Sequence, residues 1–329
     1  MKLLVIGGTH FVGRTVVGDA VARGHGVTVF HRGPAEPDGF PEVEHLHGDR
    51  DGGLDVLRGR SWDAVLDTCG YVPRVVRASA QLLSDAVGRY AFVSTLSVYP
   101  DDTPAGADEA MPTQRPPLTD DEDVTNETYG PLKVGCEMEA QGAFPGRCLV
   151  LRPGYIVGPH DPSDRFTYWV RRAAAGGEML APGPPDEALQ VVDVRDLAAF
   201  TVDHLEAGTS DVFGVAGPAA PFTWADALVS MVETTGAGTG LTWVEERFLQ
   251  ERVRDQDGEL PLWDIAYPGL HRFDPSKAIA AGLRHRAFAD TVSDTAAWDR
   301  DRDRGPLKAG LTPERERDLL DAWLAAETA

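Results

Sequence analysis

The first half of the chain alternates between two hydrophobic patterns. Short apolar or β-branched runs bounded by Gly, Pro and Asp are typical of buried strands. They occur at residues 2–6, 27–31, 43–46, 62–67, 90–94 and 148–152. Between them, residues 12–23, 74–87 and 129–143 place apolar side chains at helical spacing. Strands separated by helices pair in parallel, with helices on both faces of the sheet. The sequence therefore predicts an α/β fold built on a doubly wound parallel sheet.

After about residue 155 the alternation gives way to helical patterns. These predict helices at residues 165–175, 196–206, 224–234, 288–300 and 313–326. We expect a first domain over residues 1–155 and a smaller, mostly helical lobe over residues 156–329, with some segments of that lobe returning to the sheet. Trp224, Trp243, Trp263 and Tyr267 could line an apolar pocket, but aromatic residues spaced this widely belong more often to the core. We expect core.

Composition and charge narrow the classes of function. The 329 residues are 42% hydrophobic, enough for a sizeable core. No stretch approaches the ~18 apolar residues of a membrane span, and the opening run at residues 3–6 is shorter than the ~7–15 of a signal peptide. We expect a cytoplasmic protein with no membrane partner. The formal net charge of −21 repels phosphate backbones, so nucleic acid is not an expected partner.

Cysteine and histidine usage gives no sign of a metal site or a disulfide framework. Cys69, Cys136 and Cys148 are an odd number without CxxC spacing. His45 and His47 share one face of a predicted strand, but no carboxylate cluster or HExxH pattern accompanies them. We expect no bound metal.

The sequence VIGGTHFVGR joins the first predicted strand to the first predicted helix. Gly7, His10 and Gly13 recur there at intervals of three. Unpaired backbone N–H groups and the helix dipole at the start of a helix favour a pyrophosphate, and the first turn of such a sheet is where dinucleotides dock. A tight glycine turn without a ligand would carry the same residues. The position in the fold favours the dinucleotide site.

A second candidate site lies about 120 residues further on, in TYGPLKVG. Tyr129 and Lys133 are four residues apart and therefore share one face of a helix. A phenol with a pKa near ~10 is a poor acid or base at neutral pH, and an adjacent ammonium would bring that pKa toward a useful range. Hydroxyl donors are available in Ser94, Thr95 and Ser97 after the fifth strand, where such residues also form turns or caps.

Taken in order, the segments GGTHFVG, HGDRD, FVSTLSVYP, YGPLK and LRPGYIVGPHDPSDRF resemble the short-chain dehydrogenase/reductases. They are most similar to the extended and atypical members known as NAD(P)-dependent epimerases or dehydratases with GGTxF turns. The resemblance covers roughly residues 1–200 and ends at VVDVRDLA. It implies a Rossmann sheet that binds a dinucleotide, a second lobe that binds substrate, and an enzyme whose catalytic residues are Thr95, Tyr129 and Lys133.

The expected cofactor site combines this resemblance with the turn residues. Its members are Gly7, Thr9, His10, Phe11, Val12, Gly13, His31, Arg32, Asp49, Arg50, Cys69, Tyr129, Lys133 and Pro153. The resemblance implies that Gly7 and Gly13 hold the pyrophosphate and that Asp49 and Arg50 lie near the adenine.

The chain departs from the family pattern at three places. Many extended members have a glycine where His10 stands, so this side chain must point outward or contact the phosphates; we expect a working variant of the site. After the fifth strand, sugar-nucleotide dehydratases typically have the sequence TDEVY, whose acidic residues act as the acid and base that expel water. This chain has TLSVY there, starting at Thr95, and lacks both acidic residues. Nucleotide-sugar epimerases commonly have an asparagine after the sixth strand. Here residues 153–155 read PGY, which puts a UDP-sugar substrate in doubt.

The end of the second predicted strand bears on the choice of cofactor. A carboxylate there binds the adenosine ribose and repels a 2′-phosphate, so NAD sites tend to carry one. This chain reads VTVFHRGP, with Arg32 following His31 and no acid before Glu36. A guanidinium suits a phosphate, although a solvated arginine in a turn is the simpler alternative. We expect NADP(H) rather than NAD(H).

These features predict an NADP(H)-dependent oxidoreductase that reduces a ketone or aldehyde of a small metabolite. Thr95 would hold the carbonyl oxygen, Tyr129 would deliver a proton, and Lys133 would tune Tyr129 and hold the ribose. One alternative is an NAD(P)-dependent epimerase of a sugar or sugar nucleotide. Another is a catalytically dead dinucleotide- or RNA-binding protein, because the GGTxF group resembles a plant plastid protein associated with RNA. The segment 217–290 matches no substrate signature, and a homodimer through residues 129–143 is the expected assembly.

Overall fold

The computed structural model describes residues 1–33, 40–117, 122–218, 221–253, 256–263, 269–302 and 305–328. Its central sheet has seven strands in the order β10-β6-β5-β4-β1-β2-β3, and every neighbouring pair is parallel. The strands are β1 (Lys2–Ile6), β2 (Gly26–His31), β3 (Glu44–His47), β4 (Trp62–Asp67), β5 (Val87–Val93), β6 (Cys148–Pro153) and β10 (Val212–Val215). The predicted α/β fold with a doubly wound parallel sheet is confirmed.

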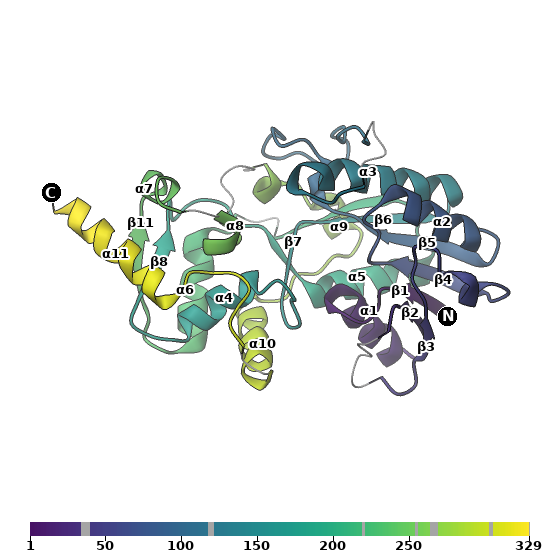
Figure 1. The fold of residues 1–329 in the computed structure, drawn as a ribbon, viewed down its shortest axis with the longest axis horizontal. Coiled ribbons are helices and arrows are strands. Elements are labelled where there is room, and N and C mark those ends of the chain that lie inside the picture. Colours follow the sequence, from purple (N-terminus) through teal and green to yellow (C-terminus); the bar gives the residue numbers. More distant parts are fainter. Residues whose placement is uncertain are drawn as a thin grey trace.

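Helices cover both faces of this sheet (Figure 1). On one face α1 (Phe11–Ala22) packs against α5 (Val194–Ala207), and on the other α2 (Pro73–Leu83) packs against α3 (Asn126–Ala143). The strands alternate their apolar side chains between the two layers. Leu3 and Val5 belong to the core under α1 and α5, while Leu4 and Ile6 belong to the core under α2 and α3. The sheet is therefore buried on both faces, as a parallel sheet requires.

The predicted helix over residues 74–87 is wrong at its end. The helix α2 stops at Leu83, and Val87 already begins β5. Only three residues separate the two elements, so the apolar positions of helix and strand run together in the sequence. Two backbone bonds enforce the break: the N–H of Ala86 donates to the carbonyl of Leu83, and the N–H of Trp62 in β4 donates to the carbonyl of Ala86. The seventh strand, β10, was not among the predicted strands.

The second lobe contains four longer helices and a small parallel sheet. These are α4 (Arg165–Ala173), α6 (Trp224–Thr235), α10 (Phe288–Asp301) and α11 (Pro313–Glu327), with β8 (Glu178–Pro182) paired to β11 (Gly240–Val244). The short helices α7 (Glu246–Gln250) and α8 (Gln256–Glu259) complete it, whereas α9 (Ser276–Ala280) packs against β10 of the central sheet. A further parallel pair, β7 (Tyr155–Val157) with β9 (Val191–Asp193), runs between the two lobes (Figure 1). Three 3₁₀ turns lie at Asp55–Leu57, Leu96–Val98 and Leu270–Arg272.

The chain crosses back to the first domain after residue 155. Both α5 and β10 belong to the central sheet and its helical cover, and Ala278 and Leu283 join the core beneath α5. Within the described ranges, no helix is long and apolar enough to cross a membrane.

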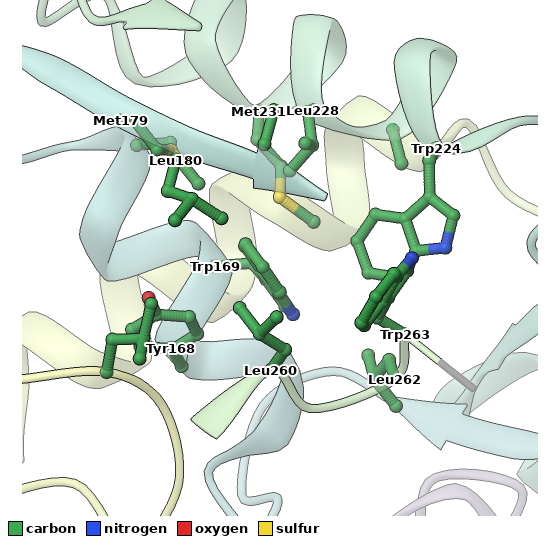
Figure 2. Close-up of a cluster of buried hydrophobic side chains, with 14 of the residues drawn as sticks. Tyr168, Trp169, Met179, Leu180, Trp224, Leu228, Met231, Leu260, Leu262 and Trp263 are labelled. Atoms are coloured by element: carbon green, nitrogen blue, oxygen red, sulfur yellow. The ribbon is translucent and has the colours of Figure 1, made fainter. Parts of the chain in front are cut away.

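Tryptophan residues form the centre of the second lobe rather than a pocket wall (Figure 2). Trp224 and Trp263 are each 1% exposed, and the ring of Trp224 meets that of Trp169 edge-on at 5.2 Å. Trp243 is partly buried against the same core. The core interpretation is confirmed for these three predicted aromatics, while Tyr267 lies outside the described residues.

Candidate active site

The carboxyl ends of β1 and β4 lie side by side where the strand order reverses. Gly7, directly after β1, has a φ of +91°, and a Cβ there would lie 2.8 Å from both the Sγ of Cys69 and the Oγ1 of Thr68. A Cβ at Gly13 would lie 2.5 Å from the carbonyl oxygen of Gly7. The turn therefore needs glycine at both positions, which brings the start of α1 against the strand. This is the place where dinucleotides bind in open parallel sheets.

The start of α1 is open to an anion. His10 occupies the N-cap position, its side chain is exposed, and it makes no capping hydrogen bond. The first turn of the helix contains no acidic residue. Thr9, Phe11 and Val12 around it are half-buried. Backbone N–H groups without side-chain caps fit a pyrophosphate. A dinucleotide fits this turn, and the histidine does not fill it.

The end of β2 carries a histidine cluster and an exposed arginine. His31 is buried, its Nε2 lies 3.0 Å from the Nδ1 of His45, and its ring meets that of His47 edge-on at 4.7 Å. The register that pairs His31 with His47 explains this cluster. Arg32 is exposed and bonds to none of the described residues, while Glu36 lies outside them. In the described part of the chain, no group of His, Cys, Asp and Glu could hold a metal ion.

Two residues predicted near the adenine lie in different surroundings. Asp49 is exposed, and its carboxylate accepts the backbone N–H of Asp51. Arg50 donates from both Nη atoms to the carboxylate of Asp67, at 2.7 Å each, and contacts Cys69 Sγ at 3.4 Å. Burial would raise the pKa of the Asp67 carboxyl, but the Arg50 guanidinium outweighs it and holds that pKa below its usual range. The side chain of Arg50 is thus part of a buried ion pair, and its predicted place near the adenine stays a prediction.

Thr95 and Tyr129 meet at the carboxyl end of β5. Thr95 caps the turn Leu96–Val98 by accepting the N–H of Ser97, at 3.1 Å, and its hydroxyl also donates to Ser97 Oγ. Tyr129 in α3 lies beside Thr95, whose side chain lowers the pKa of the phenol. A Cβ at Gly130 would lie 2.2 Å from the carbonyl oxygen of Ser97, so only glycine lets α3 approach closely enough. The structure therefore brings these two predicted residues together.

The pKa of Tyr129 differs from the expectation. Burial raises it to about 12, Tyr71 adds to the rise, and the Thr95 side chain and the charge of Arg165 offset only part of it. Lys133 was expected to lower this pKa but is directed elsewhere. Its Nζ donates to the carbonyls of Gly70, at 2.8 Å, and Val93, at 2.7 Å. Burial lowers the pKa of Lys133 to about 8.

A buried ion pair fixes α3 against the sheet. Arg152 in β6 donates to both carboxylate oxygens of Glu137 in α3, at 2.9 and 2.6 Å, and to the hydroxyl of Tyr99, at 2.8 Å. The side chains of Arg152 and Glu137 are 9% and 4% exposed. This contact links α3, β6 and the turn after Thr95. Pro153, at the end of β6, is buried next to it.

Three side chains that follow β6 in the sequence approach the carboxyl end of the sheet, and the sequence predicted no role for them. The ring of Tyr155 stacks on that of His271 at 5.2 Å, and the guanidinium of Arg165 lies 5.2 Å from the Tyr155 ring centre. The Nδ1 of His271 accepts the N–H of Gln190, while its Nε2 is buried without a partner among the described residues. Burial lowers the pKa of His271 to about 4. The sequence could have pointed to Arg165 as a site residue, because it lies near the end of the segment GPHDPSDRF, which carries the family resemblance.

Comparisons with known proteins bear on the fold of this chain. Residues 61–216 match the model of the NAD dependent epimerase/dehydratase family. A protein of Arabidopsis thaliana, the chloroplast stem-loop binding protein of 41 kDa b, is 26% identical over 236 residues, which span 66% of this chain and 58% of that protein.

Among solved structures, the fold resembles two epimerases crystallised with NAD. The UDP-glucuronic acid 4-epimerase of Bacillus cereus superposes with a TM-score of 0.64 at 15% identity, over 91% of this chain and 99% of that one. The UDP-glucose 4-epimerase of Thermus thermophilus superposes with a TM-score of 0.62 at 20% identity, over 92% of this chain and 99% of that one. The chain is therefore similar to the NAD dependent epimerase/dehydratase family over residues 61–216, and it shares the fold of these two epimerases.

Proposed function

We propose that this protein is an NADP(H)-dependent oxidoreductase that reduces a ketone or aldehyde of a small metabolite. The observation that carries the proposal is the contact between Thr95 and Tyr129, beside a buried Lys133, at the same sheet edge as the glycine turn. When bound, the dinucleotide supplies the hydride.

The protonation state of Tyr129 supports reduction. With a pKa of about 12 the phenol keeps its proton throughout the neutral range, and a protonated phenol is the form that donates. Thr95 and Tyr129 can therefore both hydrogen-bond one carbonyl oxygen, and Tyr129 can protonate that oxygen as it gains charge. Lys133, held by two backbone carbonyls beneath them, keeps a positive charge near the site below about pH 8.

Arg32 supports the choice of NADP(H). It is exposed at the end of β2, where a 2′-phosphate would lie, and it bonds to none of the described residues. A hydrogen bond to a charged group favours NADPH over NADH by roughly 10- to 150-fold. Arg32→Ala should remove most of this preference through NADPH alone, whereas Arg58→Ala, at another exposed arginine, should not. Equal affinities of the wild-type protein for NADPH and NADH would refute the preference.

A second candidate is an epimerase that uses the same hydride transfer twice. The family match and the two 4-epimerase structures complexed with NAD favour it. The sequence PGY at residues 153–155, in place of the asparagine common in nucleotide-sugar epimerases, counts against a UDP-sugar.

Cofactor stoichiometry separates the two candidates. The purified protein is incubated with NADPH or NADH and a panel of small ketones, aldehydes and UDP-sugars, and the loss of reduced nicotinamide absorbance is compared with product formed. The proposal predicts one NADPH consumed per product alcohol. Product formed from a UDP-sugar without net consumption of cofactor would refute it and establish the epimerase.

A further inference from the structure

Arg165 is a second-lobe residue at the edge of the catalytic site. It begins α4, and its guanidinium carbon lies 5.2 Å from the ring centre of Tyr155 in β7. β7 follows β6 directly, and a Cβ at Gly154 between them would lie 3.4 Å from the side chain of Leu96, the residue after Thr95. Backbone packing thus connects the arginine to the catalytic turn.

This guanidinium lacks the carboxylate partner that other arginines of its helix have. Arg171 and Arg172 pair with Asp299, at 2.7 Å, and Glu316, at 2.6 Å. Within the described part of the chain, Arg165 forms no ion pair, and its Nε donates only to Ser163 Oγ, at 3.3 Å. The nearby Asp161 forms no ion pair with Arg165, although burial raises the pKa of its carboxyl and the charge of Arg165 offsets part of that rise. Its Oδ1 accepts the N–H of Ser163, at 2.8 Å, and the Ser163 hydroxyl, at 2.7 Å.

The charge of Arg165 reaches the catalytic phenol. It lowers the pKa of Tyr129 against the larger effect of burial. In a chain with a net charge of −21, a half-buried arginine that forms no ion pair with the described residues is retained at a cost in solvation. An anionic ligand at the site would offset that cost.

We propose that Arg165 binds an oxyanion of the substrate, a carboxylate or a phosphate group carried close to the reacting carbonyl. The guanidinium presents a planar fork of donors that matches either group with two parallel hydrogen bonds. The inference rests on the proposed function and narrows its substrate from carbonyl compounds in general to anionic ones.

Isothermal titration calorimetry tests the proposal without turnover. The protein saturated with NADP⁺ is titrated with two probes, oxalate and inorganic phosphate. Wild type should bind at least one of them, and Arg165→Met should weaken that binding roughly 10- to 150-fold, the worth of a hydrogen bond to a charged group. Arg165→Lys, which keeps the charge and loses the fork, should fall between the two. An unchanged affinity of Arg165→Met for NADP⁺ confirms that the variant is folded.

The control is Arg317→Met, which removes the same charge from an exposed position on α11. It should bind both probes as wild type does. Preference for oxalate identifies a carboxylate substrate, and preference for phosphate identifies a phosphorylated one. The proposal is overturned if wild type binds neither probe, if Arg165→Met binds as tightly as wild type, or if Arg317→Met loses as much affinity.

The outcome is separable from that of the proposed function. The matched pairs pyruvate with methyl pyruvate, and dihydroxyacetone phosphate with dihydroxyacetone, are offered together with NADPH. Oxidation of NADPH by the neutral members alone, without anion binding, would refute the role of Arg165 and leave the reductase standing. Anion binding that depends on Arg165, with no oxidation of NADPH by any carbonyl compound, would refute the reductase and leave the anion site standing.

Discussion

Lys133 shows how the environment of one residue sets its chemistry. The residue is 3% exposed, and its ammonium lies 4.3 Å from the ring centre of Phe92 and donates to the carbonyls of Gly70 and Val93. Burial lowers its pKa to about 8, against the opposing effects of Cys136, Asp67 and Glu137. A group this poorly solvated loses its proton more readily when the chain is folded than when it is unfolded.

The linkage between this pKa and folding predicts a stability change. Between pH 8 and 10.5 the unfolded chain holds a proton at Lys133 that the folded chain has released, so raising the pH stabilises the fold. The unfolding free energy of wild type relative to Lys133→Met should therefore increase by about 3 kcal/mol from pH 7 to pH ~10.5. Urea denaturation of both proteins at several pH values measures it. A difference that stays constant over this range would contradict the assigned environment of Lys133.

At the scale of elements, the position of α3 decides whether a site exists. The helix begins with a capping box in which Thr125 accepts the N–H of Thr128 and the Thr128 hydroxyl accepts the N–H of Thr125. Its middle is fixed by the buried pair of Glu137 with Arg152 in β6. Because Tyr129 and Lys133 lie between these two anchors, both are held against the ends of β4 and β5.

Breaking this ion pair should destabilise the protein strongly. Glu137→Gln keeps the volume but leaves the Arg152 cation buried without a counter-charge, which costs about 3–5 kcal/mol. The double variant Glu137→Met with Arg152→Met removes both charges and should recover most of that loss. Urea denaturation of wild type, Glu137→Gln and the double variant measures these differences in the free energy of unfolding. A single variant as stable as wild type would show that the pair does not hold α3.

The elements of the first domain were largely predictable, and the contacts between them were not. The bounds of β1 and β4 were predicted without error because buried parallel strands are continuous apolar runs bounded by Gly, Asp and Pro. The end of α2 was missed because its pattern merges with β5. Thr95 and Tyr129 were predicted as partners from the resemblance. No local pattern relates Glu137 to Arg152, or Arg50 to Asp67, because these pairs join different elements across the fold.

For the molecule as a whole, the formal net charge of −21 bears on which partners the protein can bind. The Arabidopsis relative is named a stem-loop binding protein, but it is 26% identical, and the match covers 58% of its length. A net charge of −21 opposes association with a phosphate backbone. We therefore propose a small-molecule ligand rather than a nucleic acid as the partner of this chain.

An electrophoretic shift assay with a stem-loop RNA tests this consequence of charge. At ~0.15 M salt and protein concentrations up to ~10 μM, within the range of non-specific affinities, we expect no shift. The same preparation should bind NADPH, measured by fluorescence. A retarded RNA band that weakens as salt is raised would instead favour an RNA-binding role.

The central claim is that the glycine turn and the Thr95–Tyr129–Lys133 group form one redox site. Tyr129→Phe tests it most directly, with two readouts on the same protein: the dissociation constant for NADPH, and the single-turnover oxidation of bound NADPH by the best carbonyl compound of the panel. We expect a nearly unchanged dissociation constant and a turnover rate lower by ~10²–10⁴, the usual cost of losing a positioned proton donor. Turnover equal to that of wild type, or a wild-type protein that binds neither NADPH nor NADH, would contradict it.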